Sequence, residues 1–121
     1  MPTAAEELRR LLGEFNERHA AELSMVVSRT GVPIAHEGPE DLNVDTFASL
    51  AATLMNAAEV MYTGLGRAPP DRIVAQSEGG TLVASGLGSK AMFVALGKRD
   101  EILRGIEEMT AGIRTVLTGR P

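Results

Sequence analysis

The sequence has 121 residues, a net charge of −4, two histidines and no cysteine. This length suits one domain with one hydrophobic core, which we expect to span residues 1–121. The twelve Lys and Arg residues are scattered along the chain, which argues against a nucleic-acid partner. The lack of cysteine excludes disulfides, thiolate metal sites and a cysteine nucleophile, as is typical of a cytoplasmic protein. The start, MPTAAEELRR, lacks the apolar core of a signal peptide.

The first predicted element is a surface helix that begins after Thr3 and ends near His19. Thr3 followed by Glu6 has the spacing of a capping box, in which each residue's side chain accepts a hydrogen bond from the other's backbone. The apolar residues behind it recur at helical spacing and mark one buried face. They are Leu8, Leu11, Leu12 and Phe15.

Two β-hairpins are predicted, one on each side of a long central helix. The first joins residues 22–29 to residues 32–36 through a turn at Thr30 and Gly31. Pro33 places its second strand at a sheet edge, because proline cannot donate to the strand ladder. The second hairpin joins residues 71–78 to residues 81–87 through Gly79 and Gly80, a strong two-residue turn signal.

The apolar run at residues 91–96 predicts a strand in the middle of the sheet, covered on both faces. A last helix begins near Asp100 and buries one stripe. Its members are Ile102, Ile106, Met109, Ile113 and Val116.

The fold class that follows is α+β, with a single five-stranded antiparallel sheet in the order helix-strand-strand-helix-strand-strand-strand-helix. The long helix is expected on one face and the two terminal helices on the other. The sheet edges are then the strands at residues 32–36 and 71–78. The second edge has no proline, so it is open to pairing with another chain.

The central helix, residues 45–66, carries more apolar residues than one sheet face requires. One row is expected to pack on the chain's own sheet; its members are Phe47, Leu50, Leu54, Ala58, Met61 and Leu65. A second apolar row is expected to meet another chain; its members are Ala48, Ala51, Met55 and Tyr62. The back face has few charges. Asn56 and Glu59 inside the helix argue against a membrane span, and no direct membrane insertion is expected.

The element order, SRTGVPIA across the first turn, TFASLAATLMNAAE in the central helix and the Gly-rich hairpin near Gly79 together resemble the Roadblock/dynein light chain family, over about residues 6–117. The resemblance implies a profilin-like single Roadblock-like domain without catalytic activity. It also implies a homodimer in which the third strands pair into one continuous sheet and the central helices lie together. Such dimers commonly bind or regulate Ras-like small GTPases, or act as scaffolds.

Two surfaces are therefore predicted on this chain. The dimer interface combines the second apolar row of the helix with the open third strand; it comprises Ala48, Ala51, Met55, Tyr62, Ile73, Val74, Ala75 and Gln76. The surface for a small Ras-like GTPase is the charge-poor back face; it comprises Asp45, Ser49, Asn56, Glu59, Val60 and Thr63. No catalytic residue, cofactor or metal site is expected.

Two other functions suit the same fold. A scaffold subunit of a larger complex would use the dimer without a GTPase, and a small-ligand sensor would hold a ligand between the sheet and the long helix. An enzyme fits least. The segment Gly86 to Lys90 resembles a phosphate loop only weakly, because Lys90 follows Ser89 and a strand follows the loop. His19 and His36 lack the acid-rich spacing of a metal site.

Overall fold

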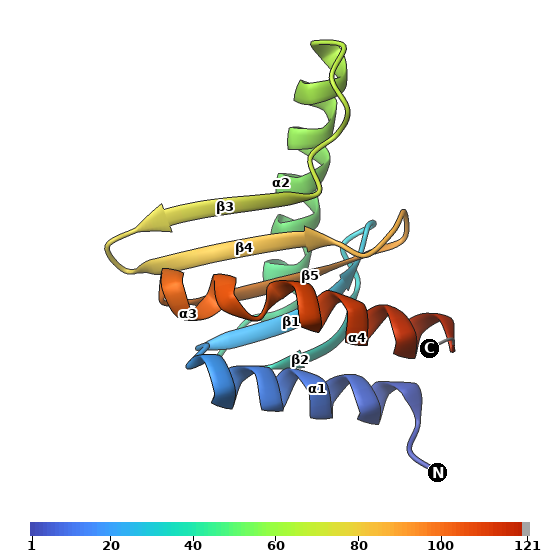
Figure 1. Cartoon of the computed structure of the whole chain (residues 1–121), viewed down its shortest axis with the longest axis vertical. Helices are drawn as coiled ribbons and strands as arrows, with labels where there is room; N and C mark the ends of the chain where they lie inside the picture. Colours follow the sequence, from blue (N-terminus) through green and yellow to red (C-terminus); the bar gives the residue numbers. More distant parts are fainter. Residues whose placement is uncertain (120–121) are drawn as a thin grey trace.

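The computed structural model describes residues 1–119. In chain order its elements are α1 (Ala4–His19), β1 (Leu23–Ser28), β2 (Pro33–Glu37), α2 (Val44–Gly64), β3 (Arg72–Ser77), β4 (Gly80–Gly86), β5 (Ala91–Gly97), α3 (Arg99–Arg104) and α4 (Ile106–Thr118). All strand pairs are antiparallel, in the order β2-β1-β5-β4-β3. Helices α1, α3 and α4 lie on one face of the sheet and α2 on the other (Figure 1). The predicted fold class, element order and both sheet edges are confirmed.

Both predicted hairpins are present, and glycine explains each turn. Gly31, between β1 and β2, has a φ of +93°, and a Cβ there would lie 3.1 Å from Cα of Ser49 in α2. Glycine therefore supplies both the left-handed backbone and the close passage of the turn beneath α2. Between β3 and β4, Gly80 has a φ of +141°.

The core has two layers, one on each face of the sheet, and β5 is buried on both sides as predicted. Phe93 of β5 belongs to the layer under α1, α3 and α4, where its ring meets Phe15 edge-on at 5.1 Å. The other layer, under α2, includes Met25, Val27, Met55, Met92 and Val94.

The helices on this face confirm the predicted capping box and add one break. The capping box of Thr3 and Glu6 is formed, and the backbone N–H and hydroxyl of Thr3 hold the pKa of the Glu6 carboxyl below its ordinary value. The single last helix that we predicted is divided at Gly105 into α3 and α4. The ring of His19 occupies the place that a Cβ at residue 105 would need, so the small residue lets α1 approach the break.

Helix α2 packs on the sheet with the second apolar row, and not with the first row as predicted. Its buried residues are Ala48, Ala51, Ala52 and Met55. In the row predicted to be buried, Phe47 and Ala58 are half-buried and the others are exposed. The prediction was wrong because both rows are apolar and only the small side chains allow the close approach at Gly31. Ala48, Ala51 and Met55 therefore lie in the chain's own core and offer no surface to a second chain.

Candidate functional site

The C-terminal part of α2 extends beyond the edge of the sheet (Figure 1). Met55 and Tyr62 are seven residues apart and so lie on the same side of the helix, yet Met55 is fully buried while Tyr62 is 44% exposed. The difference arises because the sheet ends beneath the helix between these two positions. We call residues 57–65, which are the end of α2 and its C-cap residue Leu65, the overhang.

Large apolar side chains form one exposed stripe along α2. Leu50 is 63% exposed, Met61 69% and Leu65 76%, with Leu54 in the same row. Their spacing follows the seven-residue repeat of a helix that pairs with another helix. From residue 50 to residue 65 the stripe runs for roughly 22 Å at the rise of an α-helix. A soluble monomer seldom exposes so many large apolar side chains in one row.

The edge strand β3 offers a second surface. Among residues 1–119 it pairs only with β4. Val74, Ala75 and Gln76 are exposed and Ile73 is half-buried. Its free edge carries unpaired backbone donors and acceptors without a proline to block them. These four residues of the predicted dimer interface are therefore placed where another strand can add.

Five of the six residues predicted to bind a GTPase are exposed. They are Asp45, Ser49, Asn56, Val60 and Thr63. The exception is Glu59, which is half-buried and accepts a hydrogen bond from Nη1 of Arg29 at 3.0 Å. Glu59 thus serves as a structural anchor for the start of the overhang.

Sequence reasoning missed Arg29, the residue that makes this anchor. Besides Glu59, its guanidinium donates to the carbonyl oxygens of Gly88 at 2.9 Å and Ala91 at 3.2 Å. The amide of Asn56 also donates to the backbone oxygen of Arg29, at 3.4 Å. Arg29 therefore ties α2 to the β4–β5 turn. A single basic residue at the end of a strand gives no signal of this role, because most such residues are solvated.

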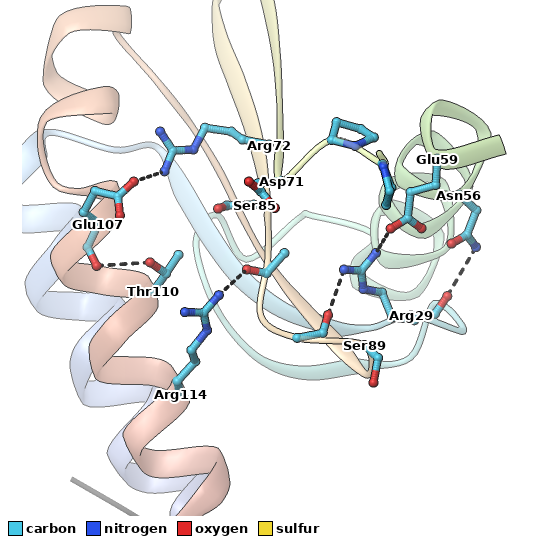
Figure 2. A pocket seen from close by; sticks show the side chains of 14 residues that line it. Arg29, Asn56, Glu59, Asp71, Arg72, Ser85, Ser89, Glu107, Thr110 and Arg114 are labelled. Atoms are coloured by element: carbon cyan, nitrogen blue, oxygen red, sulfur yellow. Dashed lines mark hydrogen bonds and ion pairs between the residues drawn. The ribbon is translucent and has the colours of Figure 1, made fainter. Parts of the chain in front are cut away.

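Beside this anchor lies a cleft of about 770 Å³ at the end of the sheet. It is lined by the segment before β3, the β4–β5 turn, α2 and α4 (Figure 2). A small-ligand sensor was expected to hold its ligand between the sheet and the long helix. The cleft does not lie between the sheet and the covered part of α2.

Residues 1–119 contain neither a metal-binding cluster nor a membrane-spanning helix. Within residues 1–119, no three His, Cys, Asp or Glu side chains gather as a metal site would require. No helix in this described part is long and apolar enough to cross a membrane.

A sequence profile described as Roadblock/LC7 domain matches residues 7–96. Comparison with curated proteins gave no significant match. Among solved structures, the chain is similar to gliding protein MglB of Thermus thermophilus, with a TM-score of 0.85 and 20% identity over 96% of this chain and 92% of that chain. A Roadblock/LC7 domain of Streptomyces avermitilis has a TM-score of 0.78 and 19% identity, over 93% of this chain and 98% of that chain. Profilin IB of Acanthamoeba castellanii has a TM-score of 0.64 and 13% identity, over 88% of this chain and 96% of that chain. At these identities the structural likeness establishes the fold, which is the profilin-like Roadblock fold.

Proposed function

Because this chain belongs to the Roadblock/LC7 domain family, we propose that it is a non-enzymatic, cytoplasmic adaptor or regulator that forms a homodimer and binds a small Ras-like GTPase through its paired central helices. Dimers of this family, as the sequence resemblance implies, commonly bind or regulate such GTPases. The observation that carries the proposal is the exposed apolar stripe of α2.

A second copy of the chain is the partner that best suits the stripe. Fully burying a Leu or Met side chain contributes about 1.5–3 kcal/mol, and Leu50, Met61 and Leu65 are each more than half exposed. Two stripes facing each other would remove them from water together. Pairing of two β3 strands adds backbone hydrogen bonds at the same edge, and it enlarges the contact toward the size of a specific interface, which buries at least about 1,000 Å².

The interface proposed for the structure therefore differs in part from the interface predicted from sequence. It keeps Tyr62 and the β3 residues, and the exposed stripe replaces Ala48, Ala51 and Met55. The resulting set is Leu50, Leu54, Met61, Tyr62, Leu65, Ile73, Val74, Ala75 and Gln76.

The back face of α2, which we call its flank, points away from the stripe and is the proposed GTPase surface. Ser49, Asn56 and Val60 are exposed there, and only Asp45 and Glu59 are charged among its six predicted residues. Since Glu59 is held by Arg29, the flank presents small, mostly uncharged groups. Two such flanks, one from each copy, would lie on the sides of the paired helices that face away from the contact between the stripes, and both would be open to a GTPase.

The dimer is tested by light scattering on the purified chain at micromolar concentration. For the wild type we expect a molar mass about twice the 12.8 kDa of one chain. For a Met61→Glu, Leu65→Glu variant we expect about the mass of one chain, because the charges cannot be buried between the two helices. Leu117→Glu is the matched control, since Leu117 is also an exposed leucine near a helix end; it should stay dimeric. A wild-type monomer would contradict the proposed pairing of the helices.

GTPase binding is tested by using the chain as bait in lysate of its source, with GDP or with a non-hydrolysable GTP analogue. We expect recovery of a small GTPase in one nucleotide condition, and its loss with Asn56→Arg, Val60→Asp. Glu17→Arg, an exposed charge change on α1, should retain binding. If the dimer forms but only nucleotide-independent partners are recovered, the scaffold function replaces the GTPase function.

A further inference from the structure

The cleft at the end of the sheet contains polar groups that no part of the proposed function uses. Its volume of about 770 Å³ lies within the range of about 300–1,000 Å³ that small-molecule sites occupy. Figure 2 shows Arg72, Ser85, Thr110 and Arg114 around one end of it and the Arg29–Glu59 pair at the other.

Arg72 and Ser85 form the sheet side of the first end. They are direct partners in the β3–β4 register, so their side chains stand next to each other on one face of the sheet. Ser85 is only 4% exposed, and its hydroxyl meets no partner among residues 1–119. In the same part of the chain, Nε of Arg72 is buried and finds no acceptor. A buried donor without an acceptor, such as Nε of Arg72, is costly and uncommon in native structures.

Arg114 and Thr110 form the helix side of the same end, one turn apart on α4. Arg114 donates to the carbonyl oxygen of Gly86 over a long 3.4 Å and makes no ion pair within the described residues. The guanidinium groups of Arg72 and Arg114 and the hydroxyl of Ser85 thus line one space. This set of donors suits the oxygens of an anion.

The carboxylates of the cleft leave this end available. Glu59 is committed to Arg29. Glu107 accepts from Nη2 of Arg72 at 2.6 Å, but its side chain is 89% exposed, so water and salt screen this pair and a ligand can compete with it. Asp71 makes no ion pair among residues 1–119 and also lines the cleft (Figure 2).

We propose that this cleft binds a small organic oxyanion, a phosphate or carboxylate, with its charged group between Arg72, Ser85 and Arg114 and with hydroxyl or amine donors directed to Asp71. The side chains, and not the backbone of the Gly86–Lys90 turn, make the site. This inference goes beyond the proposed function and depends on neither the dimer nor the GTPase.

The proposal is tested by nuclear magnetic resonance on the isotope-labelled full chain, titrated with inorganic phosphate or with acetate against chloride at constant ionic strength. We expect a saturable shift of the Arg72 Nε–H signal and of the amides near Gly86 with at least one oxyanion, and none with chloride. Arg114→Gln should weaken binding about tenfold, because one charge-assisted contact is lost. Ser85→Ala should weaken it less, because it removes a neutral donor.

The matched control is Arg104→Gln, which removes an exposed arginine whose partner is Glu101 on the same helix; its affinity should equal that of the wild type. The amide spectrum of each variant shows whether it is folded. Absence of saturable shifts with both anions, or equal weakening by Arg104→Gln and Arg114→Gln, would overturn the proposal.

The donor groups of the ligand are tested with glycerol phosphate as the probe. It should bind more tightly than inorganic phosphate in the wild type, and Asp71→Asn should abolish this advantage while leaving inorganic phosphate binding in place. If the two probes bind equally to the wild type, the proposed ligand class, an oxyanion with hydroxyl or amine donors for Asp71, is wrong.

Discussion

The two halves of α2 have similar apolar content but opposite surroundings. In the first half Ala48, Ala51 and Met55 pack against the sheet, whereas in the overhang Met61 and Leu65 face water. The same helical pattern therefore serves two purposes, and what lies beneath the helix decides which. We attribute the stability of the single chain to the first half and its association to the second half together with the exposed residues of the stripe.

The largest expected effect separates two methionines of this one helix. Met55→Ala should lower the free energy of unfolding by about 2–5 kcal/mol, because it leaves a cavity in a closed core. Met61→Ala should leave the unfolding of dilute, monomeric chain nearly unchanged, because its side chain already contacts water there. Urea denaturation at two protein concentrations measures both effects.

At high concentration Met61→Ala should lose stability relative to the wild type, since association stabilises the folded chain by mass action. If Met61→Ala instead cost as much as Met55→Ala at the lowest concentration, the overhang would be part of the monomer core. The division of α2 into two halves would then be wrong.

A smaller effect is expected at the junction of the two halves, where Arg29 holds Glu59. Arg29→Met should cost about 1–3 kcal/mol, because it removes charge-assisted hydrogen bonds and leaves a half-buried carboxylate unpaired. Hydrogen exchange should also quicken in the overhang more than in the first half of α2.

Arg10→Met is the matched control for this junction. Arg10 also contacts two acceptors, Glu7 and Glu14, but it does so on the exposed face of α1. Removing exposed pairs of this kind should leave the free energy of unfolding nearly unchanged, because water and salt screen them. Equal losses for the two variants would show that Arg29 is only a surface arginine.

Much of the fold could be predicted because its signals are local. The Thr3 cap, the Gly79–Gly80 turn and the apolar run of β5 each specify backbone geometry within a few residues. The orientation of α2 could not be predicted in this way. Periodicity gives the angle between two apolar rows but not the layer that each one meets. The bulkier row was therefore assigned to the sheet, although the row that contains Ala48, Ala51 and Met55 packs there.

The site residues were harder to predict for a related reason. The exposed residues of β3 and of the α2 flank follow from topology, which the sequence supports. Arg72, Ser85 and Arg114 come from two paired strands and a helix, and they meet only once strand register and helix packing are fixed. No spacing along the chain indicates that these three residues form a group.

The smallest expected effect compares the two ends of α2. At the first end, Oδ1 of Asn43 accepts from the backbone N–H of Thr46 at 3.1 Å, and Asn43→Ala should cost about 0.5–2 kcal/mol. Beyond the overhang, Gly66 has a φ of +71° with open space around it, so Gly66→Ala adds about 1–2 kcal/mol of local strain.

That strain should hardly reach the unfolding free energy, because the last turn of an overhang can unwind without disturbing the sheet. Both variants are best measured by urea denaturation in the monomeric Met61→Glu, Leu65→Glu background, where association cannot mask the difference. A loss for Gly66→Ala as large as that for Asn43→Ala would mean that α2 unfolds as one cooperative unit with the core. The exposed stripe would then be held rigid before any partner arrives, and the cost of ordering it on association would be small.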